Sequence, residues 1–202
     1  MSLILIDIHV QGTWQFISAQ LLLNFGEEHL LRDDLESVLH VTSWVPLRYC
    51  AHNLNAMDLS RLLINVFDAG YITPDGVSVG GREKKYAILS LRIAIDVQFT
   101  NNPELQSLIM DLTKLISVRY EPPPTEEGYW QRDIIATATF SSPEDAAKAL
   151  EKTMVVQYEK RMKELNTSDR VLEIFDRHLQ DPDKWPKNDA AKANEVLDDY
   201  AC

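Results

Sequence analysis

The most regular pattern in this chain is Tyr86-Ala-Ile-Leu-Ser-Leu-Arg-Ile-Ala-Ile-Asp-Val-Gln-Phe99. From Leu89 to Phe99 every second residue is apolar, and polar or small residues lie between them. A repeat of two places successive side chains on opposite faces of a β-strand. Because the pattern is longer than the usual strand of about five or six residues, we expect it to form the central strand of a sheet.

The residues after Phe99 predict helices and further strands around this central strand. Asn102 and Pro103 are typical of a helix start, and apolar residues at helical spacing continue this helix to about residue 116. We expect short strands over residues 117–121 and 133–140. Ser142-Pro-Glu-Asp145 indicates a helix that continues to about residue 165, with a strand over Met154 to Tyr158 as the alternative for its second half.

Residues from about 86 to 165 therefore have the order of a ferredoxin-like βαββα unit. Within this unit, Ala136-Thr-Ala-Thr-Phe-Ser-Ser-Pro-Glu-Asp-Ala-Ala-Lys-Ala-Leu150 resembles the third strand and second helix of an RNA-recognition motif. That family stacks bases on aromatic residues of its two central strands. Apart from Phe140, the corresponding positions here hold residues such as Ile135 and Thr137. The resemblance implies a shared topology without the base-binding platform.

The N-terminal residues predict a β-hairpin. Residues 3–10 are strongly apolar, and Gln11-Gly12 separates them from a second run over residues 13–19. Two such runs around a two-residue turn are typical of a hairpin. In the alternative interpretation, Thr13 caps a helix from Trp14 to Phe25.

Two helices follow this hairpin. The first covers about residues 27–42 and ends before Pro46, with a charged face that carries Glu28, Arg32, Asp33 and Glu36. The second covers about residues 57–69, with Asn55 as its cap and Gly70 as its stop.

A turn at Pro74-Asp75-Gly76 and a short strand over residues 77–79 come next, and Gly80-Gly81 forms a flexible link to the central strand. The order of helix, connector, helix and strand-turn-strand over residues 27–92 resembles a winged-helix module, a family that implies nucleic-acid binding.

These elements together predict an α+β fold with a central, mostly antiparallel sheet. We expect residues 1–80, the N-terminal hairpin and helices, to pack with residues 81–180 as one compact unit. A further helix starts at Thr167-Ser168-Asp169, and residues 181–202 form an acidic C-terminal tail.

Charge and hydropathy restrict the partners. The chain has 31 acidic and 20 basic residues among 202, a formal net charge of −11. An acidic protein is repelled by phosphate backbones, so we expect a protein partner or a homo-oligomer more than a nucleic acid. The apolar runs are too short for a transmembrane segment, and the start does not have the pattern of a signal peptide. We expect an intracellular protein, cytoplasmic or nuclear, in a reducing compartment, because its only cysteines, Cys50 and Cys202, are widely separated.

Motifs for catalysis, metals or cofactors are absent from the sequence. Neither a nucleophile elbow nor a phosphate-binding loop is present. Cys50 and His52 form too small a set of ligands for a metal site. We therefore expect no cofactor and no catalytic or metal-binding residue.

Three functions remain as hypotheses. The first is a non-catalytic interaction or scaffold protein that binds itself or another protein, with Trp185, Val196, Leu197 and Tyr200 as interface candidates. The second is a nucleic-acid-binding protein, whose contacts to nucleic acid or another anion would be Arg61, Arg82, Lys84, Lys85 and Arg92. The third is a small enzyme whose site has no recognisable motif.

Overall fold

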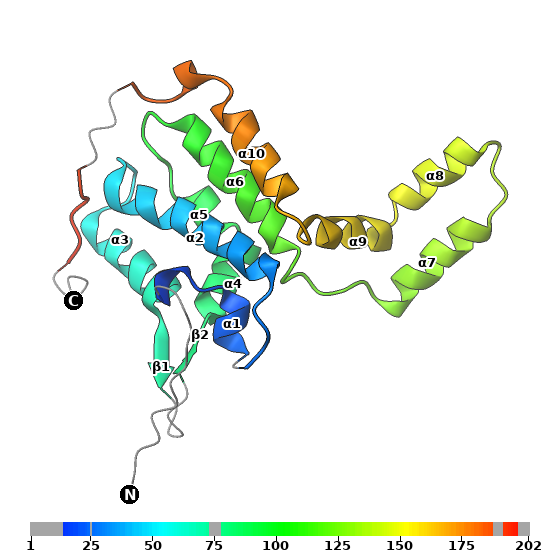
Figure 1. Cartoon of the computed structure of the whole chain (residues 1–202), viewed down its shortest axis with the longest axis horizontal. Coiled ribbons are helices and arrows are strands. Elements are labelled where there is room, and N and C mark those ends of the chain that lie inside the picture. Colours follow the sequence, from blue (N-terminus) through cyan, green and yellow to red (C-terminus); the bar gives the residue numbers. More distant parts are fainter. Residues whose placement is uncertain (1–13, 25, 73–77, 188–191, 198–202) are drawn as a thin grey trace, which may run out of the picture.

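The structure, a computed structural model, describes residues 14–24, 26–72, 78–187 and 192–197, which are mainly helical (Figure 1). The single sheet among these residues is an antiparallel pair, β1 (Gly70–Ile72) and β2 (Ser78–Gly80), with Gly70 opposite Gly80. The α-helices are α1 (Ala19–Leu23), α2 (Leu31–Tyr49), α3 (Ala56–Leu63), α4 (Arg82–Leu89), α5 (Arg92–Asp96), α6 (Pro103–Ser117), α7 (Glu126–Thr137), α8 (Pro143–Glu151), α9 (Met154–Glu164) and α10 (Asp169–Leu179). The described chain also contains two short 3-10 turns, at Trp14–Phe16 and Pro182–Lys184. A π-helical turn at Ile64–Asp68 extends α3.

The prediction that residues 86–99 form a central strand is wrong, and the predicted α+β fold class is therefore wrong too. Residues 86–96 form the second half of α4, a break, and α5, and residues 97–99 follow outside any helix, with Phe99 in an isolated bridge to His52. The break lies at Leu91, whose φ of 53° is left-handed and ends one helix before the next begins. Each short helix buries a pair of adjacent residues, Ala87 with Ile88 and Ile93 with Ala94, whereas Ile95 is 55% exposed. The alternation of apolar residues in the sequence therefore extends over two short helices and the break between them, and it does not indicate a strand here.

The strands predicted over residues 117–121 and 133–140 and as the second strand of the N-terminal hairpin are wrong as well, whereas the short strand predicted over residues 77–79 corresponds to β2. Residues 117–121 form turns at the end of α6, and residues 133–140 belong largely to α7, so the ferredoxin-like unit does not form. Residues 14–19, expected in the second strand of the hairpin, form a 3-10 turn and the start of α1. The expected first strand, residues 3–10, lies outside the described residues.

Several helices are confirmed because their starting signals are local. Asn102, Asn55 and Ser142 each accept a hydrogen bond from a backbone N–H three residues later and cap α6, α3 and α8. Residues 154–158, where strand and helix were both open, are helical, although Thr153 caps α9 as a helix separate from α8. Pro46 was expected to end its helix, yet α2 continues past it to Tyr49.

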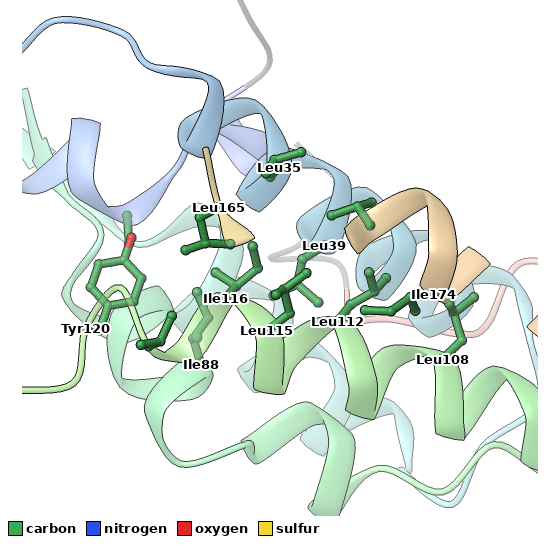
Figure 2. Packing of buried hydrophobic residues seen from close by; sticks show 13 residues of the cluster. Leu35, Leu39, Ile88, Leu108, Leu112, Leu115, Ile116, Tyr120, Leu165 and Ile174 are labelled. Atoms are coloured by element: carbon green, nitrogen blue, oxygen red, sulfur yellow. The ribbon is translucent and has the colours of Figure 1, made fainter. Parts of the chain in front are cut away.

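The element at the centre of the molecule is α6, because its side chains enter both hydrophobic clusters of the core. On one side Leu108, Leu112, Leu115 and Ile116 meet α2, α4 and α10 (Figure 2). On the other side Leu105 and Ile109 meet residues of α2, α3, α4 and α5. Eight of the 15 residues of α6 are buried. Helix packing on α6 therefore replaces the expected sheet as the organising feature.

The packing of a tryptophan side chain against two glycines holds the small sheet in place. The Trp14 indole lies against Gly70 and Gly80, so that a Cβ added at Gly80 would lie 2.8 Å from Trp14 Cζ2. Gly81, expected to be flexible, caps α4 with a left-handed φ of 88°, and a Cβ there would lie 2.5 Å from the Ala19 carbonyl oxygen. Gly80 and Gly81, predicted to form a flexible link, are therefore positions of close packing, as is Gly70.

An arm projects from this body. We use "the arm" for residues 126–151, which comprise α7, α8 and the loop between them; Figure 1 shows them extending away from α2, α3 and α6. Neither helix of the arm contains a buried residue. At its base, Gly128 lies against Val155 of α9, whose side chain is fully buried. The arm is therefore attached at one end and open along most of its surface.

Candidate functional site

The densest group of charged residues in the described chain is a buried cluster where α1, α2, α4 and the turn after α6 meet. Glu36 is completely buried, and its Oε2 accepts hydrogen bonds from Arg119 Nη1 at 2.9 Å and Tyr120 OH at 2.5 Å. Its Oε1 accepts from the Ala19 backbone N–H at 2.6 Å and lies 3.2 Å from His40 Nε2. Asp33 pairs with Arg119 and accepts from Ser18 Oγ at 2.6 Å. The sequence had placed both acids on an exposed charged face.

Lys84 extends the same cluster. Its side chain is 2% exposed, and Nζ donates to the backbone carbonyls of Trp14 at 2.9 Å and Ile17 at 3.0 Å. This lysine therefore ties α4 to the segment that leads into α1. A residue predicted as a contact for nucleic acid is instead buried inside the protein.

Burial and neighbouring charges set the ionisation of the cluster. Burial would raise the pKa of the Glu36 carboxyl, but the bonds and charges of His40, Arg119 and Tyr120 outweigh it and hold that pKa below its ordinary value. Burial lowers the pKa of His40, although its hydrogen bond to Glu36 and the charge of Glu36 act in the opposite direction. Burial also lowers the pKa of Lys84 to about 8, and burial together with the Glu36 charge raises the pKa of Tyr120.

The contacts of this cluster support a structural role. Each carboxylate is satisfied by internal donors, and Lys84, Glu36 and His40 are at most 3% exposed. A general base or nucleophile must reach a substrate, which these side chains do not. The cluster joins residues that lie up to about a hundred positions apart, as in the 3.1 Å bond from the Gln20 N–H to Tyr120 OH.

The remaining predicted cations are distributed over several elements. Arg61 is exposed on α3, and Arg82 is exposed at the start of α4. Lys85 is half-buried with Nζ 5.7 Å from the centre of the Tyr120 ring, and Arg92 is half-buried at the start of α5. Their role in binding nucleic acid or another anion stays a prediction.

The predicted interface residues of the C-terminus lie partly on the chain's own body. Trp185 packs against both core clusters, and its Nε1 donates to the His178 carbonyl at 2.9 Å. Val196 packs against the second cluster, whereas Leu197 is 46% exposed. Tyr200 lies outside the described residues. A role for these residues in contacts with another protein stays a prediction.

The surface that sequence reasoning missed is the arm. Trp130 and Ile134 are 66% and 67% exposed, and four residues apart they lie on one face of α7. The signal was present in the sequence: Thr125 followed by Glu126-Glu127 is a helix start, and its side chain caps α7 by accepting from the Gly128 N–H. The expectation of a strand over residues 133–140 concealed this face.

The arm is also strongly acidic. Its sequence contains six acids (Glu126, Glu127, Asp133, Glu144, Asp145 and Glu151) against two bases, Arg132 and Lys148. Arg132 already pairs with Asp133 at 2.9 Å and with Glu159 of α9 at 3.6 Å. The arm therefore combines an exposed aromatic and aliphatic face with excess negative charge.

Two further observations concern sites and relatives. Among the described residues, no cluster of His, Cys, Asp and Glu has the geometry to hold a metal ion, and no helix is long and apolar enough to cross a membrane. Comparisons with protein families, with curated proteins and with solved structures found no match to this chain.

Proposed function

We propose that this protein acts by binding another protein, and that the arm is its contact surface. The observation that carries this proposal is the exposure of Trp130 and Ile134 on α7, a helix that, like α8 beside it, buries none of its own residues. Tryptophan is among the residues that contribute most to binding when a partner covers it. Helices of 12 and 9 residues also have little stability alone in water, so a partner that covers them stabilises them.

The charge of the arm defines the partner further. A second copy of this chain would bring another net charge of −11 toward an acidic arm. A partner with an apolar groove edged by lysine or arginine side chains complements both the Trp130 face and the six acids. We therefore propose a foreign protein with a basic, apolar groove.

Site-specific crosslinking tests this proposal. A photoreactive phenylalanine analogue is placed at residue 130 or 134 in the full chain, and at Leu172 of α10, 56% exposed, as the control site. In cells that make the protein naturally, we expect the two arm sites to crosslink to one partner that the control site does not reach. Crosslinks to a second copy alone would contradict a foreign partner.

Purified partner then tests the arm directly. We expect Trp130→Ala with Ile134→Ala to weaken its binding by about tenfold or more, whereas Leu172→Ala leaves binding unchanged. We also expect added salt to weaken binding, because the acids of the arm face cations of the partner. Equal affinity of the arm variant and the wild-type chain would overturn the proposal.

A further inference from the structure

The described part of the C-terminal tail, residues 192–197, is seated in a specific site. It lies where α2 ends and α3 passes, at the left of the body in Figure 1. The Asn194 backbone N–H donates to the Arg48 carbonyl at 2.7 Å. Asn194 Nδ2 donates to the carbonyls of Leu47 at 2.9 Å and Cys50 at 2.7 Å. One asparagine thus meets three carbonyls at the end of one helix.

The chemistry of this end of α2 explains why an asparagine fits. The last carbonyls of a helix have no N–H partner within the helix, and the helix dipole makes this end negative. The site therefore needs neutral or positive donors and rejects a carboxylate. A side-chain amide presents two N–H groups on one nitrogen, and these face the acceptors Leu47 O and Cys50 O. His52 Nε2 lies beside them, 3.2 Å from Asn194 Nδ2 and 2.9 Å from Leu47 O.

Two more contacts extend the site along the tail. Val196 packs against the hydrophobic cluster that contains Leu47, Leu59 and Leu63. The Leu197 backbone N–H donates to Ser60 Oγ of α3 at 2.9 Å. The side chain of Glu195 is exposed between them. The contacts of the tail thus come from an asparagine, an aliphatic residue two positions later and the backbone N–H of the following residue.

We propose that this site binds a segment of a partner protein with the pattern Asn-x-Val, and that residues 192–197 occupy it within their own chain. The tail and the partner segment compete for the same acceptors of α2 and the same hydroxyl of α3. A segment that replaces the tail makes equivalent hydrogen bonds, so the exchange leaves no buried carbonyl without a donor. The site is separate from the arm and does not depend on the function proposed for it.

A labelled peptide tests the competition. The probe is Lys-Ala-Asn-Glu-Val-Leu, blocked at both ends, and its binding to the full-length chain is followed by fluorescence anisotropy at up to about 1 mM protein. We expect Asn194→Ala, which weakens the tail's own hold, to bind the peptide at least about tenfold more tightly than the wild-type chain does. The matched variant Glu195→Ala, altered at an exposed tail position, should behave as the wild type.

A second peptide and one exchange measurement complete the test. The peptide in which aspartate replaces asparagine should bind the Asn194→Ala chain at least about tenfold more weakly, because its carboxylate faces carbonyl oxygens. The hydrogen-exchange rate of the Leu197 amide should be higher in the Asn194→Ala chain than in the wild-type chain. The proposal is overturned if the amide stays protected, if wild-type and variant chains bind the peptide equally or not at all, or if both peptides bind alike.

Discussion

Glu36 is a fully buried carboxylate that depends on partners from other parts of the sequence. Replacing it by alanine leaves Arg119 buried with Asp33 as its remaining acid, and also removes the acceptor of Tyr120 OH. We expect Glu36→Ala to lower the free energy of unfolding by about 3–5 kcal/mol, measured by urea denaturation. Glu28→Ala, at an exposed position before α2, should change it by less than about 0.5 kcal/mol. Similar midpoints for the two variants would show that the cluster contributes little.

Lys84 makes stability depend on pH above neutrality. Its pKa is about 8 in the folded chain against 10.5 for the ordinary side chain, so between these values the unfolded chain binds more protons and stability rises with pH. Below about pH 8 the lysine is charged in both states and its burial cost is complete. Above about pH 10 the raised pKa of Tyr120 acts in the opposite direction.

We therefore expect the free energy of unfolding to increase by about 2 kcal/mol from pH 8 to pH 10 because of Lys84. Chemical denaturation at a series of pH values measures this increase. The variant Lys84→Met, which has no titratable amine, should lack it. If wild type and variant show the same slope, the lysine is not the cause.

Residue-level predictions from the sequence failed where the partner is distant. Asp33 and Glu36 follow the spacing of a solvated helix face, and their cation, Arg119, comes more than eighty positions later. Lys84 looked like one of several surface bases, because the carbonyls that hold it belong to Trp14 and Ile17. Local patterns contain no information about such pairings.

At the scale of elements, Gly81 and Gly26 form a matched pair for measuring close packing. Both have a left-handed φ, 88° and 92°, but an added Cβ meets Ala19 and Leu22 at Gly81 and nothing within 4 Å at Gly26. Alanine at either position carries the same backbone strain. We expect Gly81→Ala to be less stable than Gly26→Ala by about 1–3 kcal/mol, measured by thermal unfolding. Equal losses would mean that α1 moves freely away from α4.

The contrast between α6 and residues 86–99 explains which elements were predictable. The start of α6 is encoded by adjacent residues, Asn102 and Pro103, and its apolar spacing continues without interruption. In residues 86–99 the left-handed Leu91 divides the pattern, and a backbone break of this kind has no signature in a residue that is not glycine. α6 was therefore predictable from its cap and its unbroken period, whereas α7, which Thr125 also caps, was concealed by the strand pattern over residues 133–140.

At the scale of the whole molecule, the body and the arm should differ in local stability. The amides of α6 lie in the middle of the core, whereas α7 and α8 bury no residue. We expect hydrogen exchange of the isolated protein to be about tenfold or more faster in α7 and α8 than in α6. Slow exchange in α7, equal to that in α6, would contradict an open arm.

The division into body and arm could not be inferred from composition or periodicity. The two helices of the arm are capped by the side chains of Thr125 and Ser142, just as α6, which does enter the core, is capped by the side chain of Asn102. What separates them is whether another helix lies across their apolar face. That depends on the packing of the whole chain.

The buried charged cluster has a consequence for the order in which the protein folds as it is synthesised. Asp33 and Glu36 leave the ribosome well before Arg119 and Tyr120, the residues that make their burial favourable. Until then, water solvates these carboxylates better than the interior does, so α1, α2 and α4 gain nothing by closing around them. The first hundred residues should remain loosely associated during translation and condense when the end of α6 emerges.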